Sequence, residues 1–194
     1  LGSFGHEEVS AGFSGAVEGF DFSGSVSRST MDDYDTADGE EYANTGFDEK
    51  VNVSLNMGYA FRPKNRLGVI VNSFDAEGIG LPNYLSQNDL DDYADKSNES
   101  LDFSYHGTTL DGLFSWRARY FVGQDENTSF DPVASNPDFL DDGIPFEHNT
   151  AYQGAQAQLT WNPGNYRLTA GVDWLNSDIE QDFDTIRTEY DNPA

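Results

Sequence analysis

The sequence contains no cysteine, few basic residues and no long apolar run, and each absence excludes a class of protein. Without cysteine the chain cannot be a secreted module held together by disulfides. Ten Lys and Arg against 35 Asp and Glu give a net charge of −25. Such a chain repels phosphate, which excludes nucleic-acid binding. No run of 18 apolar residues occurs, so the sequence predicts no transmembrane helix.

Aromatic residues are frequent for so polar a chain. The mean hydropathy of −0.63 is low for a domain with a closed core, and acidic composition alone favours disorder. However, the 194 residues include 14 Phe, 10 Tyr and 3 Trp, which argues against disorder. Apolar strands joined by polar loops account for both observations.

The clearest periodicity begins at Val51. Apolar residues occupy every second position from Val51 to Phe61, a period that predicts a strand with one apolar and one polar face. Pro63-Lys64-Asn65 predicts a reversal, and the alternation resumes at Leu67. We therefore expect an antiparallel hairpin with about eleven residues per arm, the length that a tilted strand needs to cross a bilayer. Tyr59 and Phe61 would then lie in an aromatic belt at the interface.

The same period predicts eight strands in all. The predicted strands are 7–17, 20–27, 51–61, 67–75, 101–106, 114–122, 151–161 and 166–174. Their connections alternate strictly between short and long. Short periplasmic turns and long extracellular loops are typical of outer-membrane barrels, whereas a soluble sandwich has no reason for this asymmetry. The sequence thus predicts an all-β fold of antiparallel, up-and-down transmembrane barrel strands.

Acidic residues gather in the long segments. Of the 35 Asp and Glu, 28 lie in the segments 31–49, 75–99, 125–147 and 178–191, where Lys96 and Arg187 are the only bases. An acidic surface alone is also typical of a halophilic or merely soluble protein. The alternation of short and long connections favours the barrel.

Three motifs resemble a known family. They are Ala43-Asn44-Thr45-Gly46-Phe47 entering a strand, Leu55-x-x-Gly58-Tyr59-x-Phe61, and Ala170-Gly171-Val172-Asp173-Trp174 after a Pro-Gly turn. Over about residues 6–180 the chain resembles the barrel of TonB-dependent outer-membrane receptors, most closely the cobalamin transporter branch and its colicin-receptor and siderophore-receptor relatives. The resemblance implies that 1–194 is a barrel portion, without a visible plug domain or TonB box, of a 22-stranded barrel.

The same resemblance implies a function and partners. The chain would sit in the bacterial outer membrane, in contact with lipid, and take up cobalamin, siderophore-iron or a similar scarce ligand with energy from the TonB complex. A surface lipoprotein caps the loops of some relatives. Lumen-facing candidates for ligand passage are the polar alternates Asn52, Asn56, Arg117, Arg119, Gln156, Gln158, Arg167 and Asp173. Inside a barrel such groups also simply hydrogen-bond a plug, water and each other.

The acidic loops suggest a calcium site. Hard cations prefer carboxylate and carbonyl oxygens, and loops at equivalent places bind calcium in the cobalamin transporter branch. Candidate ligands are Asp32, Asp33, Asp35, Asp38 and Glu40 in the first loop, and Asp89, Asp91, Asp92 and Asp95 in the second. The spacing matches an EF-hand only in part, so a solvated acidic loop is the alternative. No other cofactor is expected.

Two alternatives remain at this point. A complete eight-stranded outer-membrane barrel or a porin would serve anchoring, adhesion or passive passage, although the polar segment 189–194 stands where a final membrane strand would be expected. An enzyme is not expected, because no catalytic motif occurs and His6, His106 and His148 are far apart in the sequence.

Overall fold

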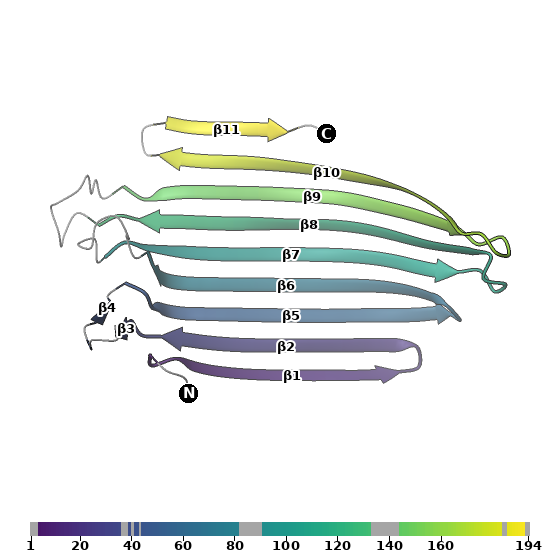
Figure 1. Ribbon diagram of the computed structural model, residues 1–194, viewed down its shortest axis with the longest axis horizontal. Coiled ribbons are helices and arrows are strands. Elements are labelled where there is room, and N and C mark those ends of the chain that lie inside the picture. Colours follow the sequence, from purple (N-terminus) through teal and green to yellow (C-terminus); the bar gives the residue numbers. More distant parts are fainter. Residues whose placement is uncertain are drawn as a thin grey trace.

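The computed structural model describes residues 4–35, 39, 41–42, 44–81, 91–132, 144–183 and 186–192. In this part of the chain every regular element is a strand (Figure 1). The strands are β1 (Glu7–Val17), β2 (Phe20–Met31), β3 (Tyr34–Asp35), β4 (Glu41–Tyr42), β5 (Phe47–Arg62), β6 (Asn65–Gly80), β7 (Tyr93–Thr108), β8 (Phe114–Phe130), β9 (Phe146–Trp161), β10 (Leu168–Phe183) and β11 (Ile186–Asn192). No helix among the described residues is long and apolar enough to span a membrane.

Nine of these strands form one antiparallel sheet. Its order, β1-β2-β5-β6-β7-β8-β9-β10-β11, follows the chain, and β3 pairs only with β4. The prediction of an all-β, up-and-down arrangement is therefore confirmed. The end strands β1 and β11 lie at opposite edges and do not pair, so the described sheet is open (Figure 1). A closed eight-stranded barrel is not what these strands form.

The four turns that join β1 to β2, β5 to β6, β7 to β8 and β9 to β10 lie together at one end of the sheet (Figure 1). The three long connections, and the two-residue connection from β10 to β11, lie at the other end. The Glu18-Gly19 turn has both residues at positive φ, 48° and 88°, as a two-residue hairpin requires. In the next short turn Lys64 has the positive φ, 67°.

The strands are longer and more numerous than predicted. Arms of about eleven residues were expected, but β5, β6, β7, β9 and β10 have 16 residues and β8 has 17. The ninth strand, β11, pairs with the outer part of β10 and lies beyond the last predicted strand, 166–174. Both differences arise because the outer parts of the strands lack a regular alternation of apolar and polar residues. Backbone pairing continues there without an apolar period to reveal it.

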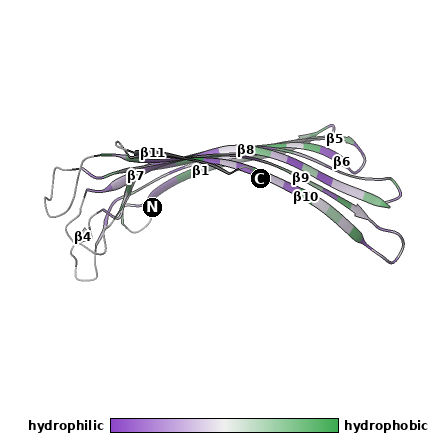
Figure 2. Cartoon of the chain, turned by 90° about the horizontal axis from the view of Figure 1, so that it is seen from above, coloured by the Kyte–Doolittle hydropathy of each residue, from purple (hydrophilic) through white to green (hydrophobic). Residues whose placement is uncertain are grey.

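The sheet is a single curved layer when viewed edge-on (Figure 2). Within the described residues only Ala76 and Ala94 are buried apolar side chains, and no large side chain is fully buried. Val9 and Val172 are 76% and 66% exposed. No interior therefore lies between two packed layers, as a sandwich would require.

Aromatic rings on this layer pack over glycines of the neighbouring strand. Phe13 on β1 lies over Gly24 on β2, and Phe22 on β2 lies over Gly15 on β1, so that a Cβ at Gly15 would come within 2.6 Å of the Phe22 ring. Rings that cover glycine shield the backbone where no second layer does so. The same reciprocal packing occurs between β8 and β9, where Phe121 lies over Gly154 and Tyr152 lies over Gly123.

Candidate functional site

One face of the sheet carries an apolar band. The register aligns Val17, Phe20, Tyr59, Leu67 and Tyr105 in a single row across β1, β2, β5, β6 and β7. On each of the eight long strands the apolar alternates fall on this same face. The predicted division of the strands into an apolar and a polar face is thus present in the sheet.

Aromatic side chains line the short-turn limit of the band. Ring centroids lie 4.8 Å apart for Phe20–Tyr59, 6.1 Å for Phe61–Tyr105 and 6.0 Å for Tyr105–Trp116. Phe114 and Trp161 continue the series with stacked rings at 6.4 Å. This aromatic rim includes both residues, Tyr59 and Phe61, that the sequence assigned to a belt.

The band runs obliquely to the hydrogen-bonded rows. Its limit toward the long connections is Val9 on β1. When the paired residues are followed from strand to strand, Val9 aligns with Glu180 on β10. On β10, however, the band ends at Trp174, six residues nearer the short turns. The limit of the band at the short turns shifts in the same direction. The register aligns Val17 on β1 with Val172 on β10, but on β10 the band continues to Leu168, four residues nearer the short turns. With about 3.3 Å per residue and about 4.8 Å between strands, this slip corresponds to a strand tilt of about 30°.

The other face holds a polar depression of about 410 Å³ between β8, β9 and β10. Two rows of the register build it. One row aligns Arg119, Gln156 and Asp173, and the next aligns Arg117 and Gln158 with Gly171. Because Gly171 has no side chain, space remains beside Arg117 and Gln158. Five of the eight predicted lumen-facing residues therefore lie together: Arg117, Arg119, Gln156, Gln158 and Asp173.

The two arginines of this depression differ in their partners. The Nε of Arg119 donates to Asp102 Oδ1 at 2.8 Å and to Oδ2 at 2.7 Å, and its guanidinium lies 4.5 Å from the centre of the Phe121 ring. Arg117 has no acidic partner among the described residues and is exposed. It also borders a second depression of about 310 Å³ next to His106. Of the two arginines, Arg117 is therefore the one more available to a polar ligand.

A second ion pair on this face spans three strands. The Nε of Arg66 on β6 donates to Asp21 Oδ2 on β2 at 2.9 Å, although β5 lies between these strands. The guanidinium crosses β5 over Gly58, where any Cβ would overlap it. Asn56 accepts a further bond from Arg66 Nη2 at 3.4 Å. Sequence reasoning missed this pair and also Asp102, although isolated charges among small polar alternates were a usable signal.

The remaining lumen candidates lie elsewhere. Asn52 donates through Nδ2 to Ser27 Oγ at 3.4 Å, well outward of the depression along the strands. Arg167 precedes β10, which begins at Leu168 rather than at Tyr166 as predicted. Its Nε donates to Asn162 Oδ1 at 3.1 Å within the turn, so Arg167 belongs to the short-turn end.

At the long-loop end Asp33 binds backbone rather than presenting free oxygens. Its carboxylate accepts the N–H groups of Asn44 at 2.8 Å and of Thr45 and Gly46 at 2.7 Å. Burial alone would raise the pKa of Asp33, but these hydrogen bonds outweigh burial and hold the pKa below its usual value. Asp33 thus holds the start of β5 against the end of β2.

The calcium hypothesis finds no support among the described residues. There, no three His, Asp or Glu side chains are placed to hold a metal ion. Asp95 accepts the backbone N–H of Gly78 at 2.8 Å, a structural use like that of Asp33. Asp32, Asp91 and Asp92 are described but belong to no such cluster. Outside the described side chains lie Asp35, Asp38, Glu40 and Asp89.

Charge divides sharply between the two ends of the strands. We define the band segments as the apolar band with its short turns, residues 9–26, 51–71, 101–122 and 155–174. They contain five acids and six bases, whereas the rest of the chain contains 30 acids and four bases. The band segments are nearly neutral, and the rest of the sequence carries essentially all of the net charge.

These features define an open, up-and-down antiparallel sheet with one apolar and one polar face. No protein-family model matches the chain. No curated protein matches it by sequence either. Among solved structures, the chain is similar to the copper transporter OprC, with a TM-score of 0.72 and 13% sequence identity over 91% of this chain. The chain spans about 28% of the length of that transporter chain. At this identity the likeness shows the fold alone.

Proposed function

We propose that this chain forms part of the wall of a transport barrel in the bacterial outer membrane, with the apolar band against lipid and the polar face toward the lumen. The oblique band carries the proposal. Strands of membrane barrels tilt by roughly 35–45° from the barrel axis, so a band of constant height must cross their hydrogen-bonded rows obliquely. The band here does so at about 30° and has an aromatic rim, as barrel girdles have.

The open sheet edges support the same assignment. Unpaired backbone groups are not tolerated in lipid, so further strands must pair with β1 and β11 in the assembled protein. The similar fold of a much longer copper transporter chain, of which this chain spans 28%, fits that requirement. We therefore propose that these strands belong to a wide barrel. The resemblance to TonB-dependent receptors implies that such a barrel has 22 strands.

The charge distribution favours neutral or cationic ligands. Outside the band segments the chain contains 30 acids and only four bases, a balance that would attract cations and repel anions within about 8–10 Å at physiological salt. Metal ions, metal chelates and cobalamin are compatible with such an entrance. Behind it, the depression with Arg117, Gln156 and Asp173 offers donors and acceptors to a passing polar ligand. We propose that uptake is driven through the TonB complex rather than passive.

Brominated lipids test the membrane placement. All three tryptophans, Trp116, Trp161 and Trp174, lie on the apolar face, so bromines on the acyl chains should quench most of the fluorescence in vesicles. The matched control carries its only tryptophan on the polar face, as F121W with W116F, W161F and W174F. That variant should be quenched by aqueous iodide and not by brominated lipid. Equal lipid quenching in both proteins would refute the placement.

Uptake assays test the transport step. Cells expressing the protein should accumulate labelled cobalamin, ferric siderophore or copper ion faster than cells without it, and accumulation should stop when TonB is absent. Uptake that continues without TonB would favour the passive pore. Absence of uptake for cationic and neutral ligands alike would remove the transport proposal while leaving the membrane placement intact.

A further inference from the structure

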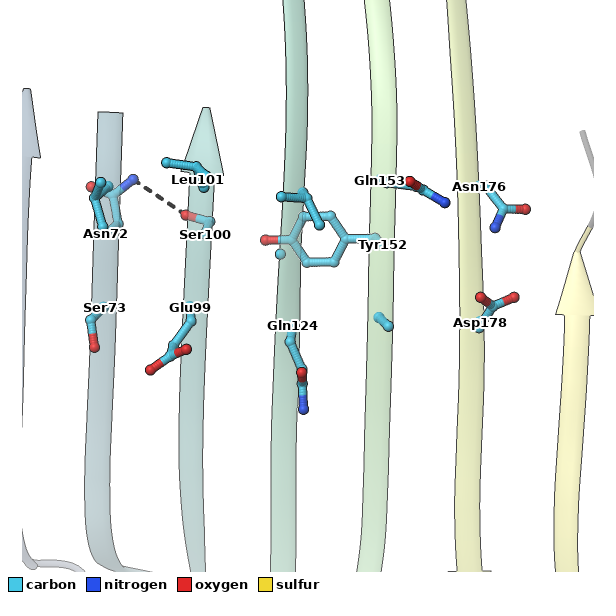
Figure 3. Close-up of a pocket in the computed structure, with 14 residues that line it drawn as sticks. Asn72, Ser73, Glu99, Ser100, Leu101, Gln124, Tyr152, Gln153, Asn176 and Asp178 are labelled. Carbon is cyan, nitrogen blue, oxygen red and sulfur yellow. Dashed lines mark hydrogen bonds between the residues drawn. The ribbon is translucent and has the colours of Figure 1, made fainter. Parts of the chain in front are cut away.

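A hollow of about 610 Å³ lies on the apolar face where the apolar band ends on β6 to β10 (Figure 3). We call it the outer trough. Its wall toward the short turns includes Val71, Leu101 and Val122, which are neighbours in one row of the register. In the next row outward Glu99 aligns with Gln124. The row of Val71, Leu101 and Val122 continues into Gln153 on β9 and Asn176 on β10, so the apolar wall ends at β8. The polar wall consists of the next row outward together with Gln153 and Asn176.

The polar wall has a definite chemistry. Two carboxylates, Glu99 and Asp178, are accompanied by the amides of Gln124, Gln153 and Asn176 (Figure 3). The lining includes no Lys, Arg or His. A ligand headgroup bound here would contact hydrogen-bond donors, hydrogen-bond acceptors and two negative charges. Such a wall favours a group that is positively charged or neutral over a bare phosphate.

We propose that the outer trough binds a membrane lipid whose headgroup carries an ammonium group. An acyl chain would lie along Val71, Leu101 and Val122, which continue the apolar band without a break. The ammonium would pair with Glu99 or Asp178, and the amide groups would donate to the phosphate and ester oxygens of the same lipid. This inference rests on the proposed function, because lipid must lie against the apolar face.

Lipid preference at Trp174 tests the proposal. Trp174 lies two residues from Asn176 on the same face of β10, so its fluorescence reports on lipid in the trough. The W116F/W161F variant keeps only Trp174, and the W116F/W174F variant keeps only Trp161 at the aromatic rim. Each is reconstituted into phosphatidylcholine vesicles that contain brominated phosphatidylethanolamine or, separately, brominated phosphatidylglycerol.

From the quenching of Trp174 we expect the ethanolamine lipid to displace phosphatidylcholine about threefold better than the glycerol lipid does. This ratio of relative binding constants is in the range expected for a single exposed charge pair. At Trp161 the two lipids should quench equally. Adding E99Q and D178N should bring the ratio at Trp174 to about one, while E7Q and E8Q, which remove the same charge from β1, should leave it unchanged. Circular dichroism confirms that each variant retains its strands.

The outcomes separate the two proposals. Quenching at both tryptophans with no lipid preference would overturn the lipid site but keep the membrane placement. A preference that E7Q and E8Q also abolish would reduce the site to general surface charge. No quenching at either tryptophan would overturn the membrane placement itself.

Discussion

The band segments and the long-loop ends of the same strands are ordered by different means. In the band, rows of apolar and aromatic side chains face one side, and ion pairs such as Arg66–Asp21 lie on the other. Beyond the band most residues on both faces are polar, apart from isolated contacts such as the stacked rings of Tyr93 and Phe130. There the backbone pairing is supplemented by side-chain to backbone bonds such as those of Asp33 and Asp95. The comparison shows that backbone pairing defines how far the sheet extends, whereas side chains define which part of it suits a membrane.

The largest effect should come from a charge placed in the band. Ala118 is exposed on the apolar face of β8, midway between Phe114 and Val122, so A118R removes almost no packing. If lipid covers this face, the buried guanidinium should cost about 2–4 kcal/mol of unfolding free energy. Urea titration in lipid vesicles, followed by tryptophan fluorescence, measures this cost.

The matched control lies on the same strand and face outside the band. T128R introduces the same side chain ten residues outward on β8 and should cost about 0–1 kcal/mol. Similar costs at both positions would mean that the two regions share one environment, and the distinction between band and outer sheet would fail.

An intermediate effect is expected at Gly58. G58A places a methyl group where the Arg66 guanidinium crosses β5, so the ion pair with Asp21 must open. Because these side chains are partly exposed, we expect a loss of about 1 kcal/mol. In an R66A background the same substitution should cost almost nothing, and the double-mutant cycle measures the coupling.

Gly12 provides the control for this substitution. It also lies on a strand of the sheet, but a Cβ there would meet Gly24 O at an ordinary 3.4 Å. G12A therefore reports the intrinsic effect of replacing glycine by alanine in a strand. If G58A and G12A change the unfolding free energy by the same amount, Arg66 can reach Asp21 without crossing over Gly58, and the absence of a side chain at Gly58 is not needed for the ion pair.

Most of the band could be predicted from sequence, because a strand with two unlike faces repeats every second residue. The limits of the first predicted strand, 7–17, are those of β1. The outer halves of β7, β8 and β10 were missed, since segments such as 93–99 carry no regular apolar alternation. The short strand β11 was missed for the same reason.

The polar face shows what periodicity leaves open. Alternation identified Arg117, Arg119 and Gln156 as polar alternates, and the register brings them together. It could not identify the Arg66–Asp21 pair, because the contact depends on β5 lying between two strands and on a glycine at the crossing point. Contacts between strands that are not neighbours require the register, which a single sequence does not contain.

The smallest effect should appear at Asp33, and its pH dependence distinguishes the two ends of the sheet. The pKa of Asp33 is lowered, so the stability that its carboxylate contributes is present above the unfolded value of about 3.9 and is lost as the pH falls through the lower folded pKa. Protection of the amides of Asn44, Thr45 and Gly46 from hydrogen exchange should therefore fall below about pH 4.

D33N keeps one acceptor oxygen but loses the charge. It should reduce the neutral-pH protection of these three amides about fivefold, the difference between a charged and a neutral hydrogen bond, and remove its acid dependence. Asp111 supplies the comparison at the short-turn end, where Thr109 Oγ1 at 2.5 Å and the Leu113 N–H at 3.0 Å lower its pKa. Because Asp111 binds only within its own exposed turn, D111N should change exchange at Leu113 alone. An effect of D33N confined to a single amide would show that Asp33 does not hold β2 and β5 together, and that the outer sheet relies on backbone pairing alone.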